Sequence, residues 1–383
     1  MLVDIAAALP LIIWLYLLLL RGRFWLPREL PEAARPARAT VIAVMPARDE
    51  AATIGRAVRS LLEQDLPVPL RLIVVDDGST DGTADAARAA AAAVGAAERL
   101  TVLQGAPWQP GWTGKLWALS QGVAAAGRWS ADYLLFTDAD IEHDRHTVAA
   151  LLGHAAEHRL DMVSLMVRLS TASFAERCLI PAFVFFFLKL YPPRWIASAR
   201  SAVAGAAGGC ILIRPAALER AGGLGAIRGR IIDDCALAAI VKASGGSLAL
   251  ALTRRSRSLR VYGTFREIGA MISRTAFNQL RHSWWLLAAT LLGLGVTYLA
   301  PPLLVWSRQP SIAACAAAAW ALMSVCYLPM VRLYRLSALY ALLLPAVALF
   351  YAGATLHSAV RFALGRGGQW KGRAQDVRAA GGV

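Results

Sequence analysis

The sequence predicts an α/β domain built on a largely parallel sheet and joined to apolar segments that belong in a membrane. Between residues 40 and 136, short β-type runs alternate with amphipathic helical stretches, which is the pattern of parallel strands with right-handed crossovers. In addition, 57% of the 383 residues are hydrophobic and 17% are charged. This composition is too apolar for an ordinary soluble enzyme and too charged for a membrane bundle alone.

The net charge indicates which partners the protein binds, and the cysteine spacing indicates the redox compartment in which it resides. The formal net charge of +15 comes mostly from arginines near apolar segments, which favours the cytoplasmic face of a membrane with anionic lipids over nucleic acid. We therefore expect no nucleic-acid partner. The five cysteines show neither CxxC nor metal-ligand spacing, so we expect structural thiols in a reducing compartment. They are Cys178, Cys210, Cys235, Cys315 and Cys326.

The N-terminal segment predicts a membrane anchor. Residues 5–20 are almost wholly apolar and are followed by Arg21 and Arg23. A signal peptide carries its charge before the apolar run and a small-residue cleavage site after it, whereas here the order is reversed. We expect an anchor over residues 1–22 with its C-terminal end in the cytoplasm. Residues 23–39, which contain three prolines, are predicted to be a linker.

Residues 40–260 are predicted to form the α/β domain. In its first helix Ile54, Val58 and Leu61 recur at helical spacing and make one buried face. In such a Rossmann-like domain, ligands bind beyond the carboxyl ends of the strands. The expected strands are 40–45, 70–75, 100–103, 133–136 and 161–168, and the expected helices are 51–63, 82–97, 115–126, 146–159 and 233–244.

The apolar run Tyr133–Phe136 stops at two carboxylates one residue apart, Asp138 and Asp140. In a strand, residues i and i+2 point to the same side, so these two can share a hard cation such as Mg²⁺ or Mn²⁺. That cation could in turn hold a diphosphate. The alternative is an acidic turn that caps the helix starting near His146.

Polar residues also follow the first two predicted strands. The first strand is followed by Pro46–Glu50, and the second by Asp76 and Asp77 in a glycine-containing turn. A carboxylate at this edge can accept hydrogen bonds from a ribose or a uracil-like base. Asp81 and Gly78 are more simply explained as a helix cap and a turn glycine.

Two further sites lie at predicted helix starts. Lys115 follows Gly114, and a lysine beside free backbone N–H groups can meet phosphate, although the full P-loop spacing is lacking. Asp233 and Asp234 open the helix 233–244. One of them can cap the helix, and the other is free to act as a general base.

The remaining apolar segments are less regular. Residues 178–191 are interrupted by Pro181 and Lys189 and are too short to cross a bilayer of about 30 Å. They predict either an interfacial or re-entrant element or a buried core helix. Residues 261–284 are predicted to be a basic interfacial segment, and residues 285–358 to be transmembrane helices.

The C-terminal spans pose a conflict. The apolar segments near 285–306, 312–331 and 336–356 are each long enough to span. The arginines at 332 and 335 and the basic tail 359–383 both belong on the cytoplasmic side, which three spans cannot satisfy. One segment must then be re-entrant or interfacial, and 336–356, with Pro345 at its middle, is the candidate.

A series of motifs in this chain resembles that of the family-2 glycosyltransferases of the GT-A fold, over residues 40–260. With the N-terminal anchor and the ending 365–373, the layout most resembles the hopene-associated glycosyltransferase subgroup. The motifs are Pro46–Glu50, Val75–Ser79, Gly114–Lys115, Asp138–Asp140, Gly208–Gly209 and Asp233–Asp234.

The resemblance implies roles for these residues. Glu50 and Asp77 contact the nucleoside, with Asp76 beside them. Pro46 and Lys115 also lie at the donor site.

For the reaction itself, the resemblance implies that Asp138 and Asp140 hold the metal and the diphosphate of the donor, and that Asp234 is the base. Asp233 stands where the family has glutamate, so the choice between the two aspartates stays open. The Gln-x-x-Arg-Trp motif of processive synthases is absent at 279–284.

The implied function is a membrane-bound, metal-dependent, inverting glycosyltransferase of the inner membrane, with a cytoplasmic catalytic domain. It moves a sugar from a nucleotide-sugar donor to a hydroxyl of a lipid acceptor such as a hopanoid or polyprenoid. The alternatives are a non-catalytic nucleotide-sugar-binding scaffold of a lipid-synthesis complex and a polysaccharide synthase.

Overall fold

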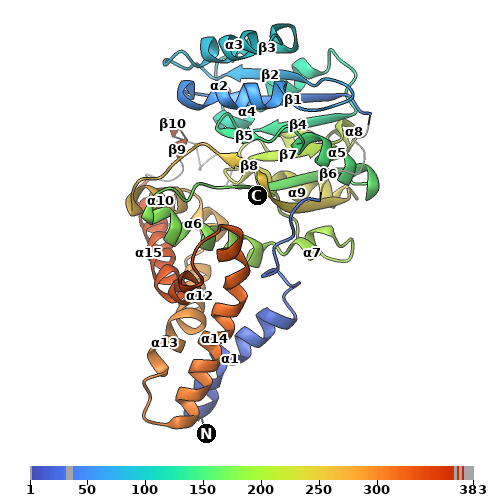
Figure 1. Cartoon of the computed structure of the whole chain (residues 1–383). Helices are drawn as coiled ribbons and strands as arrows, with labels where there is room; N and C mark the ends of the chain where they lie inside the picture. Colours follow the sequence, from blue (N-terminus) through green and yellow to red (C-terminus); the bar gives the residue numbers. More distant parts are fainter. Residues whose placement is uncertain (1, 32–37, 366–368, 371–372, 375–383) are drawn as a thin grey trace. The chain divides into compact units, whose positions relative to one another are not determined.

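A computed structural model describes residues 2–31, 38–365, 369–370 and 373–374, and it divides into two compact units (Figure 1). The sheet unit comprises the described residues of Arg28–Ser170, Trp195–Arg260 and Gln369–Val383. The apolar-helix unit comprises those of Met1–Pro27, Thr171–Arg194 and Val261–Gly368. Residues 171–194, which lie within the predicted domain 40–260, are part of the apolar-helix unit. Most of the predicted tail 359–383, and positions 366–368 and 371–372 of its motif, lie outside the described residues.

The sheet unit is built on an eight-stranded mixed sheet in the order β3-β2-β1-β4-β7-β6-β8-β5. β1 to β4 pair in parallel, whereas β7 is antiparallel to both β4 and β6. The predicted Rossmann-like mixed α/β fold is thereby confirmed. The strands are β1 (Val41–Ala47), β2 (Arg71–Asp76), β3 (Leu100–Gln104), β4 (Tyr133–Thr137), β5 (Ile141–His143), β6 (Met162–Arg168), β7 (Cys210–Ile213) and β8 (Leu248–Ser258).

Helices cover this sheet. As its apolar spacing predicted, the first of them buries Ile54, Val58 and Leu61. The helices are α2 (Ala51–Leu62), α3 (Thr83–Ala93), α4 (Gly114–Ala126), α5 (Thr147–Glu157), α8 (Pro215–Arg220), α9 (Asp233–Ala243), the 3-10 turns η1 (Ala97–Arg99) and η2 (Leu224–Ile227), and α7 (Pro193–Ala197), which crosses the boundary between the units.

The helix α4 packs very closely on the sheet because of one glycine. A Cβ added to Gly122 would lie 2.2 Å from Cγ1 of Val44 on β1 and 3.1 Å from Cγ2 of Val75 on β2. Only a residue without a side chain fits this contact. The N-terminus of α4, which carries Lys115, is therefore held against the carboxyl ends of these strands.

A buried histidine fixes the end of β4. The ring of His143 hydrogen-bonds to Oγ1 of Thr137 at 2.9 Å and to Oγ of Ser256 on β8 at 2.8 Å. Burial lowers the pKa of His143 to about 4, so the ring is neutral. It ties together β4, β5 and β8 next to the Asp138 turn.

Part of the predicted linker 23–39 joins the sheet. The backbone N–H of Leu30 donates to the carbonyl of Leu252, and the N–H of Leu252 donates to the carbonyl of Arg28, at 2.8 and 2.9 Å. Residues 28–30 thus lie along β8. Residues 32–37 are outside the described part of the chain.

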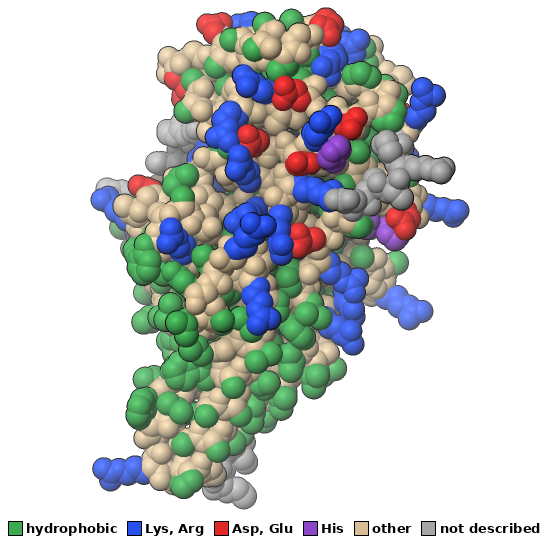
Figure 2. All heavy atoms as spheres, in the orientation of Figure 1, with side chains coloured by type: hydrophobic (Ala, Val, Ile, Leu, Met, Phe, Trp, Pro, Cys, Tyr) green, Lys and Arg blue, Asp and Glu red, His purple; other side chains and the backbone are tan. Residues whose placement is uncertain are grey.

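The apolar-helix unit carries exposed apolar side chains, which Figure 2 shows over its helices with few charged side chains among them. Large side chains such as Trp285, Leu303 and Trp306 are exposed by 88%, 73% and 85%. The elements are α1 (Leu2–Leu19), α6 (Phe174–Leu190), α10 (Phe265–Ser273), α11 (Ala276–Gln279), α12 (Trp284–Leu294), the π-helical η3 (Gly295–Leu299), α13 (Ala300–Leu304), α14 (Pro310–Leu333), the 3-10 helix η4 (Ala338–Leu343) and α15 (Leu344–Ala363).

Three stretches of the described chain are long and apolar enough to cross a membrane: Trp284–Leu304, Pro310–Leu333 and Ala338–Ala363. Proline 345 lies in the first turn of α15, where the missing N–H costs no helical hydrogen bond. Pro345 therefore lies at the start of α15 and does not interrupt it. In α1, the apolar helix Ala8–Leu19 is shorter.

Residues 178–191 were predicted to be either an interfacial element or a buried helix, and most of them lie in α6, which is a buried helix. Its side chains Leu179, Phe185 and Leu188 are almost fully buried. Phe185 packs against Tyr327 of α14 with ring centroids 5.1 Å apart. The helix starts with a capping box, in which Ser173 and Glu176 bond each other's backbone N–H groups.

Candidate active site

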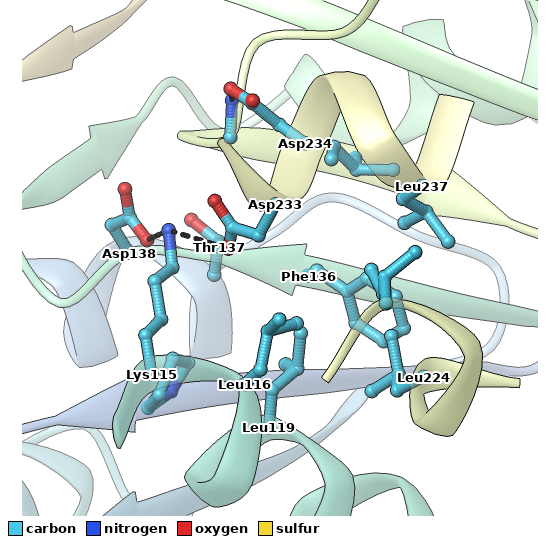
Figure 3. Close-up of a pocket in the computed structure, with 14 residues that line it drawn as sticks. Lys115, Leu116, Leu119, Phe136, Thr137, Asp138, Leu224, Asp233, Asp234 and Leu237 are labelled. Atoms are coloured by element: carbon cyan, nitrogen blue, oxygen red, sulfur yellow. Dashed lines mark hydrogen bonds and ion pairs between the residues drawn. The ribbon is translucent and has the colours of Figure 1, made fainter. Parts of the chain in front are cut away.

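A pocket in the sheet unit lies beyond the carboxyl end of β4 (Figure 3). Figure 3 shows charged side chains on one side of it and aliphatic and aromatic side chains on the other. Of the predicted site residues it brings together Pro46, Lys115, Asp138, Asp233 and Asp234. The other lining residues are Leu116, Leu119, Phe136, Thr137, Gly208, Ile211, Leu224, Ile227 and Leu237.

Lys115 holds the charged side of the pocket together. Thr113 caps α4 by accepting a hydrogen bond from the N–H of Leu116, which sets the lysine in the first turn. Its Nζ lies 2.7 Å from Oδ1 of Asp138 and 3.8 Å from Oδ2 of Asp233. Burial opposes the charge, but these carboxylates outweigh it and raise the pKa of Lys115. The lysine is therefore a permanent cation at this site.

Asp234 lies in the first turn of α9. Its Oδ2 accepts a hydrogen bond from the N–H of Gly208 at 2.8 Å, and its Oδ1 accepts one from the N–H of Cys235 at 2.7 Å. Burial and the neighbouring charge of Asp233 raise the pKa of Asp234 to about 7. A carboxylate with a pKa near 7 is suited to take up a proton at neutral pH.

The turn before β7 must approach this carboxylate closely. A Cβ added to Gly208 would lie 3.3 Å from Oδ2 of Asp234 and 3.4 Å from Nζ of Lys115. The preceding residue is fixed by the buried Ser164, whose Oγ accepts from the N–H of Ala207 and donates to its carbonyl. The turn at Gly208–Gly209 thus presents a backbone donor to Asp234.

Asp138 and Asp140 lie in a turn and not in the strand. β4 ends at Thr137, and the N–H of Ile141 donates to the carbonyl of Asp138, which reverses the chain into β5. The strand argument for a shared cation was therefore wrong in its geometry. The helix-cap alternative is wrong as well, because β5 separates this turn from α5.

An arginine that the motifs did not indicate joins two of the predicted residues. The Nε of Arg260 lies 2.9 Å from Oδ2 of Asp140, and its Nη2 lies 2.7 Å from Oε1 of Glu50. Burial and the charge of Asp138 raise the pKa of Asp140, and Arg260 partly opposes this shift. Asp138, Asp140 and Glu50 therefore interact electrostatically. Asp140 and Glu50 are not among the residues that line the pocket.

The predicted nucleoside contacts also lie outside the pocket lining. Nη1 of Arg48 donates to the carbonyl of Asp77 at 2.8 Å and lies 3.3 Å from its Oδ2. Oδ1 of Asp76 accepts from the N–H of Ser79 at 2.9 Å. Asp76 is the last residue of β2, where it pairs with Ala47 at the end of β1, and Asp77 follows it, as expected from parallel strands.

The nearby turn residues have structural roles, although Gly82 and not Asp81 holds the N-cap position of α3. Oδ1 of Asp81 accepts a hydrogen bond from the N–H of Thr83 at the start of α3. Gly78 has a φ of 69°, which favours glycine. Both residues shape the turn that carries Asp76 and Asp77.

The donor set suits a hard divalent cation. Asp138 and Asp140 offer carboxylate oxygens, and each already attracts a side-chain cation, Lys115 or Arg260. Among the described residues no group of three or more His, Cys, Asp or Glu side chains could hold a metal. Mg²⁺ typically uses one or two carboxylates and completes its shell with water and substrate phosphates, so two carboxylates fit this ion.

Comparison with known proteins agrees with this architecture. Residues 42–222 match the model of the family described as glycosyl transferase family 2. The fold is similar to that of the mannosyltransferase PcManGT from Pyrobaculum calidifontis, solved with GDP-Man and Mn²⁺. The TM-score is 0.57 at 20% sequence identity, and the match covers 93% of this chain and 97% of that one. The sheet unit is thus a GT-A-like domain.

Curated relatives match a shorter part. A 4,4'-diaponeurosporenoate glycosyltransferase of Staphylococcus aureus (strain bovine RF122 / ET3-1) is 38% identical over 98 residues, which are 26% of this chain and 23% of the relative. The enzyme of the same name from strain USA300 is 37% identical over the same length. The chain therefore spans about a quarter of the length of these relatives.

Proposed function

We propose that this chain is a membrane-bound, metal-dependent, inverting glycosyltransferase that moves a sugar from a nucleotide-sugar donor to a hydroxyl of a lipid. The observation that carries the proposal is the convergence of Lys115, Asp138, Asp233 and Asp234 on one pocket beyond the strand ends of a GT-A-like domain. Ligands bind at this edge in open α/β sheets.

Asp234 is proposed as the base. Its raised pKa and its place in the pocket suit proton uptake from an acceptor hydroxyl, whereas Asp233 lies within 3.8 Å of the cation Lys115. The N–H of Gly208 fixes the orientation of the Asp234 carboxylate. One base and a direct displacement give inversion at the anomeric carbon.

The donor is proposed to bind along the carboxyl ends of β1, β2 and β4. Asp76, Asp77 and Glu50 supply acceptors for the nucleoside, with Pro46 beside them. Asp138 and Asp140 would hold a Mg²⁺ or Mn²⁺ ion, which offsets negative charge on the departing diphosphate. Lys115 adds positive charge in the same place.

The acceptor is proposed to be a lipid, such as a hopanoid or another polyprenoid. Two observations support this: the three apolar stretches that could cross a membrane, and the relatives whose name specifies diaponeurosporenoate. The exposed Trp285 and Trp306 near the two ends of the first stretch resemble the aromatic belts of membrane proteins.

For the membrane topology we propose two crossings and one re-entrant hairpin after residue 284. Trp284–Leu304 and Pro310–Leu333 are joined by a short loop, so residues 284 and 333 lie on the same side. Trp320 lies about 20 Å from Leu333 along the axis of α14. Its indole N–H donates to the carbonyl of Leu342. The chain has thus descended well into the apolar layer where α15 begins.

The far end of α15 returns to the starting side. The N–H of Phe277, which precedes the first crossing, donates to Oγ of Ser358, and the rings of His282 and Phe362 stack at 4.2 Å. Both ends of residues 334–363 then face the cytoplasm, the side on which the catalytic domain is also proposed to lie. This arrangement satisfies the positive-inside rule for Arg335 and Arg361 at once.

The proposal is tested by measuring the transfer of a sugar from a nucleotide-sugar donor to a lipid. Membranes containing the chain are incubated with a panel of labelled sugar nucleotides, and the lipid extract is analysed. We expect a labelled lipid with at least one donor, and none with Asp138→Asn, Asp140→Asn or Asp234→Asn in folded protein. Donor binding without turnover in the unaltered protein would favour a scaffold, and long products would favour a polysaccharide synthase.

A further inference from the structure

Arg260 forms an ion pair with Asp140, one of the two proposed metal ligands. It follows β8, which ends at Ser258, and its Nε lies 2.9 Å from Oδ2 of Asp140. Its Nη2 lies 2.7 Å from Oε1 of Glu50. One guanidinium therefore serves two carboxylates from distant parts of the chain.

The two carboxylates that pair with Arg260 differ in the other groups that can interact with them. Asp140 interacts with the negative charges of Asp138 and Glu50, so a second cation is favoured at this place. Glu50 is also bonded by the hydroxyl of Thr53 at 3.1 Å. Arg260 is 38% exposed, which leaves solvent into which its guanidinium can move.

We propose that Arg260 is a built-in counter-ion of Asp140 that a divalent cation must displace, so that the guanidinium and the metal compete for one carboxylate. The proposal rests on the proposed function, because it takes Asp140 to be a metal ligand. Arg260 can keep its contact with Glu50 while it releases Asp140. Without a metal, the guanidinium pairs with both Asp140 and Glu50 and offsets part of their negative charge.

The competition has a measurable consequence in the absence of any donor. The full chain is purified in detergent, and the dissociation constant for Mn²⁺ is measured by electron paramagnetic resonance of free Mn²⁺. Arg260→Gln should bind Mn²⁺ at least about fivefold more tightly than the unaltered protein, as expected for a competing contact that is removed. Arg260→Lys, which keeps the charge but loses the planar fork, should lie between them.

Arg257→Gln is the matched control. Arg257 lies on β8 three residues earlier, is 61% exposed and pairs with Glu142. Its loss removes the same charge three residues away in the chain and leaves the Arg260–Asp140 contact in place, so its effect measures long-range electrostatics alone. Asp140→Asn should abolish the binding that Arg260→Gln strengthens.

Several outcomes overturn the proposal. Equal Mn²⁺ affinities of Arg260→Gln and Arg257→Gln would show that only net charge matters. Weaker binding by Arg260→Gln would make the arginine a support of the site, and absence of Mn²⁺ binding in all variants would remove the competition. Thermal unfolding of each variant checks folding. Transfer to lipid is measured separately, so a failed competition leaves the proposed function standing.

Discussion

Asp234 is set apart from the other carboxylates of the pocket by its surroundings. It is half-buried, it accepts two backbone hydrogen bonds, and the charge of Asp233 disfavours its ionisation. These contributions nearly balance at neutral pH. A side chain in this state can both hold and release a proton under cellular conditions.

The pH dependence of transfer follows from this. Asp234 must be unprotonated to act as a base, so the rate should rise with pH through about 7 and level off above it. Asp233→Asn removes a neighbouring negative charge, lowers the pKa of Asp234 and should shift the rise to lower pH. The measurement is a pH profile of kcat/KM for both proteins. An unchanged profile in Asp233→Asn would contradict the assignment.

A second prediction concerns the close approach of Gly208. Gly208→Ala places a methyl group 3.3 Å from Oδ2 of Asp234 and 3.4 Å from Nζ of Lys115. We expect kcat to fall about 10- to 100-fold, because small displacements of reacting groups are costly. Gly225→Ala is the control, since nothing lies within 4 Å of a Cβ there. Similar kcat values for the two variants would count against the role of the turn.

At the residue scale, the sequence predicted the carboxylates and the lysine but not their pairing. Asp138, Asp233 and Asp234 stand out because they follow apolar runs or open a helix. Arg260 did not stand out, because it is one of 40 basic residues and its partners lie 120 and 210 positions away. A long-range ion pair leaves no local pattern in a sequence.

At the scale of elements, the position of the site depends on how α4 lies against the sheet. Gly122 allows contact with Val44 and Val75, and this contact brings the start of α4 to the end of β4. Helical periodicity indicated α4 but could not indicate its distance from the strands. That distance is set by one missing side chain.

The contact makes a stability prediction. Gly122→Ala should lower the free energy of unfolding by about 1–3 kcal/mol, because a methyl group has no room beside Val44. Gly55→Ala in α2 is the control: its nearest neighbour would be 3.8 Å away, and alanine favours helix by up to about 1 kcal/mol. Thermal unfolding of the two variants should give shifts of opposite sign. A neutral Gly122→Ala would contradict the packing argument.

Element boundaries explain the main error of the sequence interpretation. The alternation of strands and helices predicted the α/β fold, and the end of β4 was expected near Phe136. The turn at Asp138 and the three-residue β5 were missed, because so short a strand has no periodicity of its own. Its place is set by pairing with β8, far along the chain.

At the scale of the whole molecule, hydropathy indicated the apolar segments but not which of them cross. The conflict between the basic residues on both sides of 336–356 was visible in the sequence. The contacts of Trp320 and Phe277 that support the proposed topology join residues 22 and 81 positions apart. The distribution of basic residues showed that three crossings conflict with the positive-inside rule, and the proposed topology rests on tertiary contacts that the sequence does not indicate.

The topology can be tested with single cysteines in a cysteine-free background. Ser337→Cys and Leu364→Cys should be labelled by a membrane-impermeant maleimide from the cytoplasmic side of inverted vesicles. Gln309→Cys, in the loop between the two crossings, should be labelled only from the other side. Labelling of 337 and 364 from opposite sides would mean that residues 338–363 cross the bilayer.

The division of the chain into interleaved pieces also constrains its biosynthesis. The apolar helix α6 emerges from the ribosome well before Tyr327 and Tyr351, against which Phe185 and Phe186 pack. Until those partners are translated, the apolar surface of α6 lacks the side chains that bury it in the folded protein. At the same stage β8 has not yet been added to the sheet. Co-translational capture at the insertion machinery would shield this nascent segment, and a ribosome stalled near codon 260 should yield a protease-sensitive, chaperone-bound intermediate.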